Sequence, residues 1–128
     1  MDSRLMWVCL GGAAGTAARY WLSGWIPQVL GPAFPWGTLL INGLGSFLIG
    51  GVMHVGLATE LLSPTLRVAL AVGVLGGFTT YSTFSFETLR LVQEGSWGTA
   101  LLYVSATVLG CLLACALGFS AAKALVGT

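Results

Sequence analysis

Charged side chains are scarce in this sequence. Its 128 residues include five Lys and Arg and four Asp and Glu, so that 7% are charged, whereas a soluble domain averages about 25%. So few charges cannot cover a soluble surface of this size, and hydrophobic residues make up 56% of the chain. The composition excludes an ordinary soluble domain and predicts a protein embedded in a lipid bilayer.

The sequence also lacks an excess of charge of either sign. Its formal net charge is +1, and proteins that bind nucleic acid need clustered Lys and Arg to neutralise phosphates. We therefore expect no nucleic-acid partner.

Groupings of catalytic or metal-binding residues are missing as well. The single histidine, His54, has no evident role, and Cys9, Cys111 and Cys115 show no CxxC or metal-ligand spacing. The cysteines lie in apolar runs, where a cysteine usually acts as a small buried hydrophobic residue. Because no pairing of a nucleophile with a base is visible either, we do not expect an enzyme.

What the sequence does contain is four long apolar segments. Each has the length of about 20 residues that spans a hydrocarbon core as a helix, and a backbone in lipid must satisfy its own hydrogen bonds. We predict an all-α membrane protein in which residues 1–128 form a single transmembrane domain. The predicted transmembrane helices cover about residues 5–26, 36–57, 66–92 with a break near 76–80, and 97–125.

Residues 1–18 share some features with a signal peptide, namely Arg4 followed by an apolar run. Asp2 offsets the charge of Arg4, and the segments downstream are equally suited to a membrane. We expect this first segment to be retained as a helix.

Short connections at 30–35, 59–64 and 93–96 join the predicted helices. Four spans place both termini and the 59–64 connection on one side of the membrane. The basic residues divide weakly between the two sides, and this permits insertion in both orientations. One side has Arg4, Arg67 and Lys123, and the other has Arg90, with Arg19 if it lies near that end.

Small residues recur at four-residue spacing, which marks close contacts between membrane helices. We expect a homo-oligomer, most simply a dimer, with packing inside one subunit as the alternative. The small residues are Gly11 and Gly15, Gly73 and Gly77, and Gly110, Ala114 and Gly118.

Arg19 is the only ionic residue well inside a predicted span. A charge in the membrane is costly and marks a functional position. Arg19 shares a helical face with Gly15, so it is predicted to face a helix interface or a vestibule. The first two spans hold no acidic residue, which favours an anionic substrate. In the alternative interpretation, Arg19 extends to the lipid headgroups.

The second predicted span carries Thr38, Asn42 and Ser46 on one helical face. The amide of Asn42 has two N–H donors that an anion can accept. The alternative is a hydrogen bond between helices that only holds the bundle together.

The stretch GGFTTYSTFSFE (76–87) concentrates glycine and hydroxyl groups in the third span. We predict that Gly76 and Gly77 break the helix, and that the freed carbonyls bind an ion. At the end of this stretch, Glu87 lies three residues before Arg90, close enough to pair with it.

Beyond the predicted break, Tyr81 and Phe84 lie three residues apart and face the same way. Their ring edges are electropositive and can face a small anion, and the hydroxyls of Ser82 and Thr83 are stronger donors. The alternative is a polar seam between helices, in which the hydroxyls bond to their own backbone.

The fourth span has a polar residue at every fourth position. This stripe forms either a track of donors or a chance seam. It consists of Thr99, Tyr103, Thr107, Cys111 and Cys115.

Four motifs, in this order and across nearly the whole chain, resemble those of the Fluc-type fluoride channels of bacteria, which are also called fluoride exporters. They are GGAAGTAARY (11–20), PWGTLLIN (35–42), GVLGGFTTYSTFS (73–85) and the weaker ALGF (116–119).

The resemblance implies an antiparallel, dual-topology homodimer of four-helix subunits with a broken third helix and two fluoride pores. It implies passive export of fluoride from the cytoplasm through the bacterial inner membrane, which relieves fluoride toxicity. It also implies a structural sodium ion at the dimer interface, held by the backbone carbonyls of Gly76 and Thr79. The expected pore residues, with Thr38 included from its helical face, are Asn42, Tyr81, Phe84, Ser82, Thr83, Thr38 and Arg19.

The sequence departs from the family at Tyr81, where phenylalanine is usual. The ring edge is kept and a phenol is added, which bears on how fluoride is coordinated there.

Three alternatives remain open from the sequence. A small proton-coupled multidrug transporter needs a membrane carboxylate in its first helix, which this chain lacks. A non-conducting assembly subunit needs no aligned donors. A fluoride/proton antiporter has the same architecture, but no titratable residue lies at the centre of the spans, so passive flow is preferred.

Overall fold

The computed structural model describes residues 3–127, and these are helical throughout apart from short connections. Asp2 lies outside the described residues. Three helices are continuous: α1 (Ser3–Leu30), α2 (Trp36–Ala58) and α6 (Trp97–Val126). The third predicted helix consists of four successive elements, which are α3 (Pro64–Val68), the π-helix η1 (Ala69–Val74), α4 (Leu75–Phe78) and α5 (Tyr81–Gln93). The all-helical prediction is confirmed.

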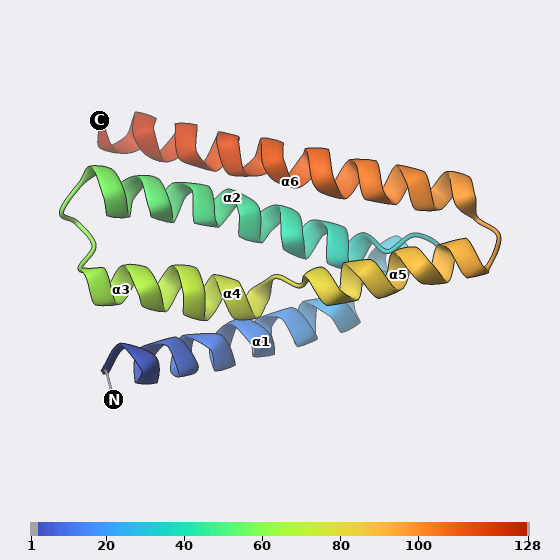
Figure 1. The fold of residues 1–128 in the computed structure, drawn as a ribbon, viewed down its shortest axis with the longest axis horizontal. Helices are drawn as coiled ribbons and strands as arrows, with labels where there is room; N and C mark the ends of the chain where they lie inside the picture. Colours follow the sequence, from blue (N-terminus) through green and yellow to red (C-terminus); the bar gives the residue numbers. More distant parts are fainter. Residues whose placement is uncertain (1–2, 128) are drawn as a thin grey trace.

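The helices run alongside one another in alternating directions (Figure 1). Figure 1 shows α2 between α6 and the interrupted third helix, with α1 against the other side of α3 and α4. Both ends of the chain lie at the same end of the bundle as the connection from α2 to α3. This is the arrangement that four successive spans require.

Within residues 3–127, three helical stretches are long and apolar enough to cross a membrane, namely α2, Pro64–Gln93 and α6. The 28 residues of α1 are sufficient in length, but α1 does not reach the same apolarity because it carries Arg19 together with several tryptophans and small residues. The first predicted span, which corresponds to α1, therefore stays a prediction. In addition, α1 continues through Pro27 to Leu30, beyond its predicted end at residue 26.

Glycines allow the helices to approach closely. A Cβ on Gly77 would lie 2.6 Å from the carbonyl oxygen of Gly12, and one on Gly11 would lie 2.8 Å from that of Ala69. On the other side of the bundle, Gly118 packs directly on the carbonyl of Phe47. These contacts confirm that small residues mark close helix contacts, except at Gly110, where an added Cβ would meet no atom within 4 Å among residues 3–127.

The break in the third helix lies after the paired glycines rather than at them. Gly76 and Gly77 are inside α4, and the extended residues are Thr79 (φ −86°, ψ 157°) and Thr80 (φ −149°, ψ 116°). The prediction that the paired glycines break the helix was wrong because at least Gly77 serves close packing against α1. The break itself remains within the predicted range 76–80.

Candidate functional site

The side chain of Asn42 holds the extended segment in place. Its Nδ2 donates to the carbonyl oxygen of Thr80 at 3.0 Å, and its Oδ1 accepts from the Thr80 N–H at 2.8 Å. Asn42 is buried on α2, and its Oδ1 gives the Thr80 N–H an acceptor in place of the helical one that the break removes. The amide holds helices together, as the alternative interpretation expected, and Nδ2 carries a second N–H.

Thr80 is also the N-cap residue of α5. Its Oγ1 accepts from the Thr83 N–H at 3.3 Å, which is the hydrogen bond of an N-cap, and donates to Thr83 Oγ1 at 3.0 Å. Ser82 Oγ lies 3.4 Å from the same oxygen. By contrast, Ser85 and Thr88 donate to carbonyls one turn back, those of Tyr81 and Phe84. Some hydroxyls of this stretch therefore donate to their own helix backbone, whereas those of Ser82 and Thr83 lie beside the Thr80 hydroxyl.

The break changes the surroundings of the two carbonyls expected to bind sodium. In an unbroken helix the Gly76 carbonyl would accept from the Thr80 N–H, and the Thr79 carbonyl would accept from the Thr83 N–H. Those two N–H groups donate instead to Asn42 Oδ1 and Thr80 Oγ1. Both carbonyls have thus lost their usual helical donors, which leaves oxygen lone pairs for another ligand.

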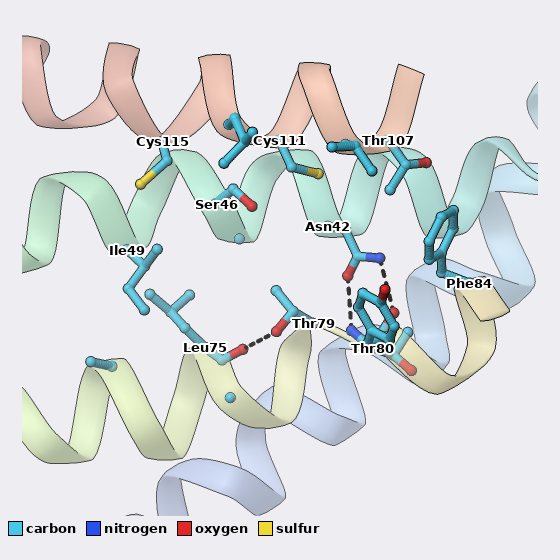
Figure 2. Close-up of a pocket in the computed structure, with 16 residues that line it drawn as sticks. Asn42, Ser46, Ile49, Leu75, Thr79, Thr80, Phe84, Thr107, Cys111 and Cys115 are labelled. Carbon is cyan, nitrogen blue, oxygen red and sulfur yellow. Dashed lines mark hydrogen bonds between the residues drawn. The ribbon is translucent and has the colours of Figure 1, made fainter. Parts of the chain in front are cut away.

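A cavity of about 480 Å³ lies among α2, the broken third helix and α6 (Figure 2). Its wall contains Asn42, Tyr81 and Phe84, which were all predicted site residues, and also Gly76 and Thr79. Thr107, Cys111 and Cys115 line it from α6, so this part of the four-residue stripe faces the cavity. Thr107 is buried, and its Oγ1 has no hydrogen-bond partner among the described residues.

The aromatic side chains meet edge to face. The Phe84 ring is buried, with its centroid 5.6 Å from that of Tyr81 and 5.1 Å from that of Tyr103. Tyr103 is fully buried, whereas Tyr81 is 80% exposed. Phe84 is thus fixed from two sides, in an arrangement that presents ring edges as well as faces.

A second, smaller cavity of about 370 Å³ lies beside the connection 31–35. Thr38 lines it from α2, one turn before Asn42, and Thr83 lines it from α5. Neither Ser82 nor Arg19 is among the residues that line the two cavities. The structure therefore divides the predicted site residues between two neighbouring cavities and a surrounding region.

Glu87 lies in the wall of the smaller cavity and accepts a hydrogen bond from the Tyr103 hydroxyl at 3.1 Å. The expected pairing of Glu87 with Arg90 was wrong, because Arg90 pairs with Glu94 at 3.4 Å, one turn further along the exposed side of α5. The side chain of Glu87 points toward α6 instead.

Arg19 contacts the end of α4. Its Nε donates to the carbonyl oxygen of Gly77 at 3.1 Å, where a helix C-terminus favours a cation. The guanidinium therefore lies at a helix interface, as one interpretation predicted, and is held there by the interrupted helix.

The roles of Thr80 and of the pair of Tyr103 and Glu87 were not predicted from the sequence. Threonine is one of the residues preferred at a helix N-cap, and this preference could have placed the start of α5. The Tyr103–Glu87 contact has no local signal, since it joins two helices.

Comparisons with known proteins show the family of this chain. A family described as CrcB-like protein, Camphor Resistance (CrcB), matches residues 6–119. A protein of Sorangium cellulosum named fluoride-specific ion channel FluC is 52% identical over 96% of this chain and 97% of its own length. Proteins of the same name from Anaeromyxobacter dehalogenans (55% identical, 88% and 89% covered) and Citrifermentans bemidjiense (45%, 95% and 98%) are also similar.

Proposed function

Because the chain belongs to the CrcB-like protein family, we propose that it is a fluoride-specific ion channel of the bacterial inner membrane. It exports fluoride passively from the cytoplasm and so relieves fluoride toxicity. The observation that carries this proposal is the cavity at the helix break, where a buried amide, aromatic edges and hydroxyl groups from three helices converge. A transporter that exchanges protons for organic cations would need a carboxylate in α1, which has none.

The chemistry of fluoride explains this set of donors. Fluoride is small and strongly hydrated, so a pathway across the membrane must replace its water with hydrogen-bond donors or positive ring edges. Among residues 3–127, no charged residue lines the larger cavity, so an anion there is neither tightly bound nor repelled by a fixed charge. Several weak sites in series favour rapid passage.

We propose that the two cavities are consecutive parts of one pathway. Thr38 and Asn42 lie one turn apart on α2, and each lines one of the cavities. Thr83 and Phe84 are adjacent on α5 and divide between the cavities in the same way. Fluoride then passes Thr38 and Thr83 in one cavity and Phe84, Asn42 and Thr107 in the other, with Ser82, Tyr81 and Arg19 near the path.

The channel is proposed to be an antiparallel, dual-topology homodimer with two pores. Many large apolar side chains are exposed in the single chain, among them Leu109 and Leu113 on α6, and they can contact either lipid or a second subunit. The weak bias of basic residues permits both orientations.

A structural sodium ion between the subunits fits the residues present. Sodium is a hard cation that takes oxygen ligands, and the break diverts the usual donors from the Gly76 and Thr79 carbonyls. These two carbonyls would hold the ion. A bound cation would supply positive charge that lowers the repulsion between anions in neighbouring pores.

The test is fluoride release from liposomes that contain the purified protein, followed with a fluoride electrode, with chloride release as the control. We expect rapid release of fluoride and none of chloride above that of protein-free liposomes. A well-folded protein that releases no fluoride would contradict the proposal and favour a non-conducting assembly subunit. Equal release of both anions would contradict its selectivity.

A further inference from the structure

Two of the three cysteines lie one helical turn apart in the wall of the larger cavity. Cys111 and Cys115 are both half-buried on α6, and both line this cavity together with Ser46 of α2 (Figure 2). Side chains four residues apart on a helix have Cβ atoms about 5–6 Å apart. The third cysteine, Cys9, is exposed on α1 and does not line this cavity.

The backbone beneath this pair of thiols is fixed. Gly50 of α2 packs directly on the carbonyl of Cys115, and α6 is continuous from Trp97 to Val126. Each thiol has a single side-chain torsion, and rotation about it can turn the two sulfurs toward one ligand. The helix therefore fixes the distance between the two cysteine Cβ atoms, and only the side-chain rotamers of the two cysteines can adjust to a ligand.

The rest of the cavity wall restricts which ligand can bind to these sulfurs. Within the described part of the chain, no carboxylate or imidazole lines the cavity, so a cation that requires those ligands finds none among these residues. Thiolates select soft metal ions, of which copper(I) is the biological example. Silver(I) has the same charge and the same preference for sulfur.

We propose that Cys111 and Cys115 together bind one thiophilic monovalent cation of the copper(I) and silver(I) class, and that the bound cation blocks the passage of fluoride. In binding, two S–H bonds break, two metal–sulfur bonds form, and two protons pass to water. No electron is transferred. Two thiolates and one monovalent cation leave a net charge of −1 in a cavity without other charges, and this charge repels an anion.

The blocking effect rests on the proposed channel function, whereas the metal site does not, so the two are measured separately. Metal binding is measured by native mass spectrometry of the Cys9→Ser protein with silver nitrate in chloride-free medium. We expect one silver ion per chain, and its loss in the same protein with Cys111→Ser and Cys115→Ser added. Equal silver binding by both proteins would overturn the site.

Blocking is measured as fluoride release from liposomes with increasing silver, each variant being compared with its own silver-free rate. We expect Cys9→Ser to be blocked like the unaltered chain. Cys111→Ser and Cys115→Ser should each raise the half-blocking concentration at least about tenfold, which corresponds to 1.4 kcal/mol. Because both sulfurs hold one ion, either single change should have nearly the full effect.

Three results would overturn the proposal. Silver bound without any change in fluoride release would show that the ion does not block. A block that disappears only in Cys9→Ser would place the sensitive thiol on α1. Single variants that each keep the full block would show that the two thiols act independently. A failure of fluoride release before any silver is added would count against the channel function, and the mass measurement would still decide the site.

Discussion

The side chain of Asn42 combines a structural contact with a proposed contact to fluoride. Asn42→Ala removes both hydrogen bonds to the Thr80 backbone, and each buried group left unpartnered costs about 1–3 kcal/mol. We expect a lower melting temperature in detergent and a loss of fluoride release from liposomes. Ser46→Ala, one turn further on the same face and in the same cavity, is the matched control for stability. Release that stays unchanged in Asn42→Ala would contradict a role for this amide in the pathway.

Phe84 tests whether aromatic ring edges contribute to the pathway. Phe84→Leu keeps an apolar side chain in the buried position but removes the edge. Since an aromatic contact is worth about 0.5–1.5 kcal/mol, we expect fluoride release to slow by up to about tenfold. Phe86→Leu changes the same residue type on the exposed side of α5 and should leave release unchanged. Equal rates in the two variants would argue against the edge interaction.

Tyr81 lies where the resemblance to the Fluc-type channels predicts a phenylalanine. Its ring packs edge to face with Phe84. We expect Tyr81→Phe to conduct fluoride at the unaltered rate because the ring edge is kept, and Tyr81→Leu to conduct more slowly. If Tyr81→Phe slows release as much as Tyr81→Leu does, the phenol itself takes part in coordination.

At the scale of the helix, comparing Gly77 with Gly76 distinguishes a role in close packing from a role in the helix break. A Cβ on Gly77 would lie 2.6 Å from a backbone oxygen of α1, whereas one on Gly76 meets nothing closer than 3.8 Å. We expect Gly77→Ala to destabilise the protein by about 1–3 kcal/mol, measured as thermal unfolding in detergent. Gly76→Ala keeps the carbonyl proposed to bind sodium and should be tolerated. The reverse order of stability would contradict the packing argument.

The extents of the helices were largely predictable from the sequence. The second helix ends within one residue of its predicted end, because its apolar run and the flanking prolines are local signals. The position of the break was not predictable from glycine alone. A glycine serves either a break or a close approach of helices, and only the packing against α1 shows which one applies to Gly77.

Some members of the candidate site were predictable from the sequence, each from the chemistry of its own helix. Asn42 and Phe84 were predicted as site residues, and they line the same cavity. The partner of Asn42 was not predictable, since Thr80 is 38 residues away in the chain. The same reason explains the error at Glu87, because sequence spacing suggested Arg90 and the fold brings Tyr103 instead.

At the scale of the whole molecule, the proposed sodium ion links the two subunits. If backbone carbonyls at the break hold it, replacing sodium with the bulky cation N-methylglucamine should reduce both fluoride release and the proportion of dimer. Dimer content is measured by native mass spectrometry, and potassium serves as a second replacement. Unchanged release and unchanged dimer content after exhaustive removal of sodium would contradict the proposed site.

The central claim is that fluoride flows passively through this protein. The most direct measurement is fluoride release from liposomes at equal pH on both sides, with a potassium gradient and valinomycin to set the voltage. The account predicts that release follows the voltage, reverses when the gradient is reversed, and needs no pH difference. Release that ignores the voltage and follows an imposed pH difference would contradict the channel and indicate proton-coupled transport.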